Sequence, residues 1–575
     1  MATTKTISKV PARPDLMSKI RMTRKLVRSG ADLGRFEASD ALDIRTYAKI
    51  ISRPASSRAH TLVSPTREYA PATGTRRALV LLVDFSDNPS TKPPAHFKAL
   101  LFSQGSYTTG SMRDYYREVS YGQLNVIGDV FGWFRAPEPY SYYTNHEHGF
   151  GIYPRNVHRL VEDVVQLAGT DVNFSDYDLD NDGYVDALFI VHAGLGAEST
   201  LDPDHIWSHR SELMFPMTVA GVKVQGYTME PEDGKIGVFC HEFGHNLGLP
   251  DLYDTDYDSS GIGDWCLMAG GSWNGRGDTP AHMSAWCKMK LGWVTPRVIF
   301  NAEKAVSLAA SATSAEILKL PVGDPASREY FLIENRRKEH FDRKLPGEGL
   351  LIWHVDDSRI NNDNQSHFMV ALEQADGLAE LENGVDEGDS GDPFPGSVNL
   401  RSFNENTNPS SRSYDGADSK IAVSNIGDTG PIINFQVRVG EVSARGGLGD
   451  RRPEDLFGVS QRVAANFNAV GISSIAQVAE MDVLALTQTL EQDTLKLFSY
   501  KARAQAVAAF NLDIEPFETI KTMKIDQILA QARTVLTAAT GEPESRIVAL
   551  KDRLAILASA LDKSALRQLT LEDVA

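Results

Sequence analysis

The sequence predicts an α+β or α/β core, followed by a β-rich subdomain and an all-α carboxyl-terminal bundle. Up to about residue 300, short β-branched or leucine-rich runs alternate with amphipathic helical segments, which indicates an α/β core. Residues 301–440 change to short alternating strands separated by Gly, Asp, Asn, Pro and Ser. Residues 454–575 contain Ala, Leu, Gln and Lys at three-and-four spacing with few glycines, a pattern typical of packed helices.

At 575 residues the chain is too long for a single hydrophobic core, so we expect several packed units. Changes in composition give the boundaries of these units. The predicted parts are a basic leader or prosegment (1–75), the core domain (76–300), the β-rich subdomain (301–440), a linker (441–453) and the helical domain (454–575).

Within the core domain, the order of elements follows from periodicity. The run Arg77 to Phe85 predicts a buried strand, because it is ended by the turn-forming residues Ser-Asp-Asn-Pro. Further along, the pattern predicts helices at 112–119 and 156–167 and strands at 124–134 and 187–192.

The β-rich part and the carboxyl-terminal part are read in the same way. Strands are expected at 330–334, 349–355 and 432–437, whereas the glycine- and arginine-rich stretch before Pro453 has no apolar face. Residues 467–479 resemble a helix-hairpin-helix unit. Because no Lys/Arg cluster flanks Gly471, we expect this domain to bind a protein partner rather than DNA.

Charge and composition exclude several classes of partner. The net charge of −18 disfavours nucleic acid, which needs a concentrated basic surface. The longest apolar runs are far short of the roughly 20 residues that cross a bilayer, so no membrane span is expected. The basic amino terminus has no apolar core of about 7–15 residues, so no secretory signal is visible. Three cysteines cannot build a disulfide framework, and Cys240 is interpreted as a small buried hydrophobe.

One segment predicts a metal site. His241 and His245 are four residues apart and therefore share one face of a helix, where both imidazoles can bind one zinc ion. Glu242 lies on an adjoining face, as a general base that takes a proton from water. Gly248 permits a sharp turn that brings Asp251 back as a third ligand, which leaves a fourth position for water.

HExxH alone is a modest signal, because a solvated His/Glu face or a non-catalytic structural metal site gives the same three residues. The added Gly248 and Asp251 make the prediction more specific, although Asp254 and Asp256 follow closely as alternative ligands. Tyr253 is a candidate oxyanion donor. Met268 lies in a turn of small residues that resembles the Met-turn beneath zinc in metzincins.

Blocks beyond this motif resemble the immune inhibitor A-like (M6) metallopeptidases. They are Met112 to Gly122, Tyr330 to Arg336, Leu345 to His354 and Ala371 to Gly377. The resemblance implies a secreted, zinc-dependent endopeptidase with a metzincin-like core. It also implies a protein or peptide substrate, a prosegment and stabilisation by calcium. The missing signal peptide and the helical end depart from the family, which leaves cytoplasmic residence or non-classical export open.

An acidic loop is the candidate calcium site. Asp178, Asp180, Asp182 and Asp186 alternate around Gly183, as in the first part of a calcium loop. Phe189 stands where an EF-hand has its bidentate Glu, and an Asx-rich surface turn is the alternative interpretation. A weaker second candidate comprises Asp386, Asp389 and Asp392.

Two alternatives to a peptidase stay open: a catalytically idle docking or adhesion protein with a structural metal, and a peptidase-like effector carried by a secretion machine. The leader also has two interpretations, a targeting tail or an inhibitory segment that covers the cleft. In the second case a carboxylate of the leader would displace the zinc water, and the candidates are Asp32, Glu37, Asp40 and Asp43.

Overall fold

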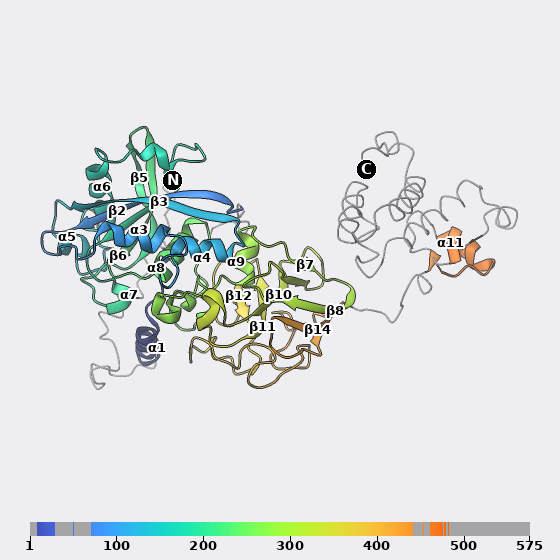
Figure 1. Ribbon diagram of the computed structural model, residues 1–575. Coiled ribbons are helices and arrows are strands. Elements are labelled where there is room, and N and C mark those ends of the chain that lie inside the picture. The colour runs from blue at the N-terminus through green and yellow to red at the C-terminus, as the bar shows by residue number, and fades with distance from the viewer. Residues whose placement is uncertain are drawn as a thin grey trace, which may run out of the picture. The chain divides into compact units, whose positions relative to one another are not determined.

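The computed structural model describes residues 8–28, 50, 71–440, 452–453, 461–474, 477–478 and 481. The chain divides into two compact units (Figure 1). The first unit comprises Met1–Ile299 and Glu303–Gly440, and the second comprises Phe300–Ala302 and Glu441–Ala575. The α/β part up to Ile299 and the β-rich part from Glu303 onward therefore share one compact unit.

The helices of the described residues lie mainly in the first half of the chain. They are α1 (Pro14–Arg28), α3 (Pro94–Phe102), α4 (Met112–Val119), α5 (Tyr140–Thr144), α6 (Val157–Ala168), α7 (Ala197–Thr200), α8 (Ile236–Asn246), α9 (Ala285–Lys290) and α11 (Gln461–Ala469). Short 3-10 helices are η3 (Phe174–Tyr177), η4 (Gly263–Trp265), η5 (Gly270–Gly277) and η6 (His340–Lys344). The helix predicted at 112–119 is confirmed as α4, whose first turn is fixed by a capping box between Ser111 and Asp114.

The strands form three sheets among the described residues. The strands are β1 (Ser8–Lys9), β2 (Gly74–Asp84), β3 (Leu124–Arg135), β4 (Leu188–His192), β5 (His209–Val219), β6 (Val222–Pro231), β7 (Arg297–Val298), β8 (Ala302–Ala309), β9 (Leu318–Pro321), β10 (Glu329–Arg336), β11 (Gly349–Asp356), β12 (Val370–Leu372), β13 (Ile421–Ser424) and β14 (Ile432–Val439). The predicted strands at 124–134, 187–192, 330–334, 349–355 and 432–437 fall within β3, β4, β10, β11 and β14 to within one residue.

The main sheet has the strand order β1-β5-β6-β4-β2-β3. Strands β2, β3, β4 and β6 run parallel, whereas β5 runs antiparallel to β6. The two-residue strand β1 then adds antiparallel to β5. Strand β5 would thus be the edge of the sheet without the amino-terminal segment, and an edge offers unpaired backbone groups to another chain.

Helices cover both faces of this sheet, as expected for a mostly parallel sheet (Figure 1). Strand β2 shows the division, because its side chains alternate between two cores. Ala78, Val80 and Leu82 pack in one cluster with residues of α3, α4 and α8. The intervening Leu79, Leu81 and Val83 pack in the other cluster with residues of α6.

The β-rich part contains a sheet of order β12-β11-β10-β9-β7 and a second of order β13-β14-β8. Strands β10 and β11 pair along their whole length, from Glu329 opposite Asp356 to Arg336 opposite Gly349. Arg336 is fully buried and donates to both oxygens of Asp342 and to the Trp265 carbonyl, 3.2 Å away. This contact ties the β-rich part to the segment that follows the predicted metal site.

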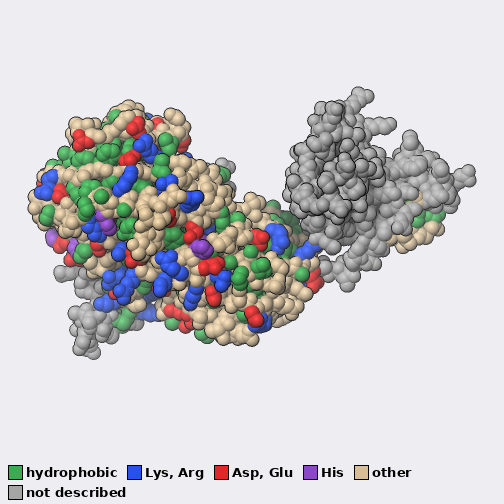
Figure 2. All heavy atoms as spheres, viewed as in Figure 1, with side chains coloured by type: hydrophobic (Ala, Val, Ile, Leu, Met, Phe, Trp, Pro, Cys, Tyr) green, Lys and Arg blue, Asp and Glu red, His purple; other side chains and the backbone are tan. Residues whose placement is uncertain are grey.

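The second unit is described only in part. Helix α11 lies within the predicted helical domain and is followed by a turn in which Gly471 has φ +83°. The rest of the predicted bundle, most of the second helix of the hairpin-like motif and most of the linker lie outside the described residues. Among the helices that are described, none is long and apolar enough to cross a membrane. On the face of the first unit shown in Figure 2, basic and acidic side chains lie among one another.

Candidate metal centre

Helix α8 carries the HExxH motif through the interior of the first unit. Its residues from Ile236 to His245 are all buried. Small residues make this possible. At Gly237 an added Cβ would collide with the Ser272 carbonyl, and at Gly244 it would lie 2.5 Å from the sulfur of Met268. The helix can therefore pack directly against the segment from Cys266 to Gly277.

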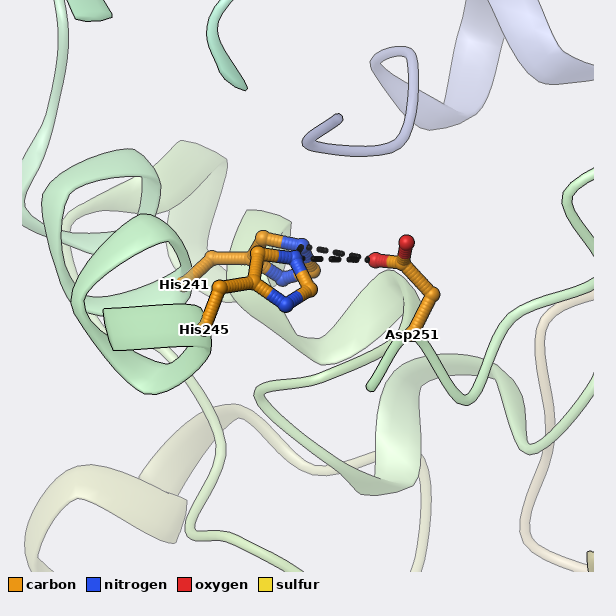
Figure 3. Close-up of side chains that lie close together, drawn as sticks. All are labelled: His241, His245 and Asp251. Atoms are coloured by element: carbon orange, nitrogen blue, oxygen red, sulfur yellow. Dashed lines mark hydrogen bonds and ion pairs between the residues drawn. The ribbon is translucent and has the colours of Figure 1, made fainter. Parts of the chain in front are cut away.

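Three ligand atoms converge on one point beside α8 (Figure 3). The Nε2 atoms of His241 and His245 lie 3.1 Å apart. Asp251 Oδ1 is 3.2 Å from the first and 3.1 Å from the second. The return of the chain depends on Gly248, which has φ +99° and donates its N–H to the His245 carbonyl at 2.9 Å.

The remaining ring nitrogens show which atoms are free to bind a cation. His241 Nδ1 lies 2.9 Å from the Leu267 carbonyl, and His245 Nδ1 lies 2.9 Å from the Leu249 carbonyl. Since a carbonyl only accepts, each Nδ1 carries the proton, and in a neutral ring Nε2 is then a lone-pair acceptor. Two such nitrogens and a carboxylate oxygen face one another, an arrangement that a divalent cation satisfies. Imidazole nitrogens with one carboxylate are a donor set suited to zinc.

Burial and neighbouring charges shift the pKa values of the site residues. Burial lowers the pKa of His241, which favours the neutral ring that binds metal. Burial alone would raise the pKa of Asp251, but the two histidines lower it by more than burial raises it. The carboxylate therefore stays ionised. Glu242 is fully buried, and neither of its oxygens has a hydrogen-bond partner among the described groups. Burial, followed by the nearby Glu230, raises its pKa well above the usual value.

Met268 and Tyr253 lie on the segments that hold this centre. Leu267 accepts from His241, and the next carbonyl, of Met268, accepts from the Leu252 N–H at 2.8 Å. The turn around Met268 thus positions both a histidine and the loop of Asp251. Tyr253 is buried, and its hydroxyl donates to the main-chain carbonyl of Lys9 at 2.7 Å.

The structure does not bring the alternative third ligands to the histidines. Asp254 and Asp256 instead form a separate group with Asp258. Arg24 of α1 pairs with Asp256 at 2.9 Å and with Asp258 at 3.0 Å. Asp251 is the carboxylate that meets His241 and His245.

The structure groups three of the four residues that the sequence proposed as calcium ligands. Asp178, Asp180 and Asp186 come together, with one oxygen of each within 4.8 Å of the others. Asp182 is not in this group, and its carboxylate accepts from the Tyr184 N–H at 2.8 Å in a local turn. Three of the four predicted residues are thus brought together. The second acidic region forms two overlapping groups, Asp376 with Asp389 and Asp392, and Glu380 with Asp386 and Asp389.

Two tryptophans that bind the amino-terminal segment were not predicted as site residues. The indole of Trp207 donates to Val10 and that of Trp273 to Pro11, each to a main-chain carbonyl at 2.8 Å. A lone Trp in a sequence gives no sign that its N–H will bind the main chain of a distant segment. The four proposed leader carboxylates, Asp32, Glu37, Asp40 and Asp43, lie outside the described residues.

Two histidines and an aspartate beside a buried HExxH helix form a candidate metal centre, with the arrangement that metallopeptidases use. Residues 68–294 match the catalytic domain of the Immune inhibitor A peptidase M6 family. The resemblance to this family is thereby confirmed, and the matched segment is a metalloendopeptidase domain.

Two relatives are similar to the chain over this region. The Pre-pro-metalloprotease PrtV of Vibrio cholerae is 35% identical over 272 residues, which cover 38% of this chain and 30% of PrtV. Immune inhibitor A of Bacillus thuringiensis subsp. alesti is 34% identical over 265 residues, which cover 36% of this chain and 38% of that protein. The similarity thus spans less than half of each relative.

Proposed function

We propose that this chain is a zinc-dependent endopeptidase that hydrolyses peptide bonds in proteins, with His241, His245 and Asp251 as the zinc ligands. The observation that carries the proposal is the convergence of three unprotonated acceptor atoms within 3.2 Å of one another. Without a cation these atoms repel one another. The names of the two relatives, a metalloprotease and an immune inhibitor of the M6 family, point the same way.

In this proposal each residue has a separate task. When bound, zinc supplies a Lewis acid that polarises the scissile carbonyl and acidifies water. Glu242 follows His241 on the same helix and takes the proton from the attacking water, then passes it to the leaving amine. Its buried, unpartnered carboxylate suits this task, because no hydrogen bond within the described residues ties it elsewhere.

We further propose a metzincin-like core. Its support is the position of Met268, whose sulfur packs against Gly244 between the two histidines, and the order of the main sheet with an antiparallel edge strand. Calcium at the loop of Asp178, Asp180 and Asp186 is a separate proposal, because three close carboxylates repel one another without a cation.

The wider biology is also proposed from these features. An extracellular place of action agrees with the precursor stage in the name of the Vibrio cholerae relative. The helical second unit would bind a protein partner. A catalytically idle docking protein is less well supported, because Glu242 is present and its side chain is not used in structural contacts among the described residues.

A metal-exchange experiment tests the proposal. The purified chain should hold one zinc, lose casein hydrolysis on chelation and regain it when zinc is returned. His245→Ala should lose the zinc itself, since two remaining ligands hold it poorly. His146→Ala is the matched control, because His146 is exposed and pairs with Asp204 away from the centre. Stoichiometric zinc in His245→Ala would show that the site is misplaced.

A further inference from the structure

The amino-terminal segment crosses the first unit as an extended strand beside the metal centre. Ser8 lies opposite Arg210 and Lys9 opposite His209, antiparallel to β5. Val10 continues the ladder by donating its N–H to the Ser208 carbonyl at 3.2 Å. In Figure 3, a segment in the colour of these residues lies above the three labelled side chains. An added strand on an exposed sheet edge is a common mode of peptide recognition.

Three consecutive carbonyls of this segment are held by side chains of the peptidase domain. Lys9 accepts from the Tyr253 hydroxyl at 2.7 Å, Val10 from the Trp207 indole at 2.8 Å and Pro11 from the Trp273 indole at 2.8 Å. All three donors are buried. Because every contact is to the main chain, this set of donors does not depend on the side chains of the bound peptide.

The side chains of the segment fill two different environments. The Lys9 ammonium lies 4.5 Å from the ring centroid of Phe150 and 5.7 Å from that of Trp207, a cation–π arrangement. Burial lowers the pKa of Lys9 to about 8. Val10 is fully buried within the apolar core. The surroundings of Lys9 thus accept a long basic side chain, and those of Val10 accept a branched aliphatic one.

The Lys9 carbonyl is linked to the proposed metal centre through Tyr253. Tyr253, which binds the Lys9 carbonyl, has its ring 6.4 Å from the ring of His241. The Lys9 carbonyl is therefore held by a residue whose ring lies close to a proposed zinc ligand, where the main chain of a bound substrate would have to pass.

We propose that Ser8–Pro11 occupy the substrate cleft in the manner of a bound substrate, and that Tyr253, Trp207 and Trp273 are the residues that bind the substrate main chain. This inference rests on the proposed peptidase function. It specifies the substrate as an extended polypeptide segment with a long basic side chain followed by a branched aliphatic one.

Helix α1 holds this segment in place through its arginines. Arg21 pairs with Glu387 at 2.7 Å, and Arg24 and Arg28 pair with Asp258 at 3.0 and 2.9 Å. Arg21 and Glu387 are both largely buried, so this pair is stronger than an exposed one. The segment and the cleft belong to one chain, so the effective concentration of the segment at the cleft is high. A peptide added from solution must compete against it.

Binding of a labelled peptide tests the inference. The probe is a fluorescein-labelled peptide of residues 6–13, and the protein is the full chain with Glu242→Gln to prevent cleavage. Adding Arg21→Ala and Arg24→Ala should release the segment and increase the affinity for the probe at least about tenfold. Lys25→Ala, at an exposed position of the same helix, is the matched control and should leave the affinity unchanged.

The donors are tested in the same opened background. Tyr253→Phe and Trp273→Phe keep the rings but remove one hydrogen bond each, so each should weaken probe binding by about 2- to 12-fold. Trp286→Phe is the control, because the Trp286 indole donates to Asp357 instead. Unchanged affinity in both donor variants, or equal affinity in the arginine and Lys25 variants, would overturn the inference.

Two further readouts keep the outcome clear. In the unmodified chain the Val10 amide hydrogen should exchange slowly with deuterium. Rapid exchange at a temperature where the chain is folded would also overturn the inference. Casein hydrolysis is measured separately with Glu242 intact. An opened chain that binds the probe and zinc but never cleaves casein contradicts the proposed function alone. Casein cleavage without probe binding contradicts this inference alone.

Discussion

The sulfur of Met268 packs against Gly244, so that a Cβ built on this glycine would lie 2.5 Å from Met268 Sδ. Gly244 immediately precedes His245, and the Met268 turn accepts the His241 Nδ1–H at the Leu267 carbonyl. The Met268 turn and helix α8 therefore pack so closely that only a hydrogen atom fits at the Cα of Gly244. Both histidines depend on this contact for their positions.

We predict that Gly244→Ala destabilises the chain by about 1–3 kcal/mol, the usual effect of overpacking a filled core. It should also weaken zinc binding, because either α8 or the Met268 turn must move. Gly226→Ala is a matched control, since the nearest atom to its added Cβ is 3.5 Å away on a flexible arginine. Chemical denaturation and zinc titration measure both effects. Unaltered zinc affinity would show that Met268 does not position the site.

The buried Arg336 gives a second prediction. Its guanidinium contacts Asp342, Glu334 and the Trp265 carbonyl, with both partner carboxylates fully buried. Arg336→Met leaves two buried carboxylates without their cation, and we expect a loss of about 3–5 kcal/mol. Arg337→Met, which breaks only the half-exposed pair with Glu339, should cost less than about 1 kcal/mol. Similar urea midpoints for the two variants would contradict this.

The same pair predicts a pH dependence. Burial opposes ionisation of Asp342, but Arg336 and then His282 more than offset it and hold the pKa of Asp342 at about 2. An unfolded aspartate titrates near 3.9, so its contribution is complete above about pH 4 and is lost as pH falls toward 2. The difference in unfolding free energy between the wild type and Arg336→Met should therefore shrink across that range. A constant difference from pH 5 to pH 2 would rule out this linkage.

The acidic loop supplies a test of calcium. Calcium should raise the thermal midpoint of the chain, since a ligand that binds the folded state stabilises it. Asp178→Ala should remove the increase, because Asp178 is one of the three clustered carboxylates. Asp182→Ala should retain it, since Asp182 binds the Tyr184 N–H instead. Equal calcium responses in the two variants would argue against an ion at this loop.

The sequence predicted the elements that depend on local patterns. Strands and helices with clear periodicity, such as α4 and β11, were found to within a residue. The pairing of His241 with His245 follows from helical spacing alone, and Gly248 marked the turn toward Asp251. These features depend on residues close together in the chain.

Features that depend on distant residues could not be predicted in the same way. Tyr253 and Lys9 are 244 residues apart, and Trp273 and Pro11 are 262 apart. Nothing in the local pattern shows that a leader strand will add to β5. Asp182 was placed with its neighbours by spacing, but the local turn to Tyr184 directs its carboxylate elsewhere. The core and the β-rich part are likewise joined by contacts between distant residues, among them that of Arg336 with the Trp265 carbonyl.

The most direct test of the account is the Glu242→Gln variant, with zinc content and casein hydrolysis measured on the same preparation. Glutamine keeps the shape of the side chain and leaves His241, His245 and Asp251 in place, but it cannot accept a proton. The account predicts stoichiometric zinc with activity reduced by at least about a hundredfold. Comparable hydrolysis by the zinc-loaded variant and the wild type would contradict the role of Glu242 as general base.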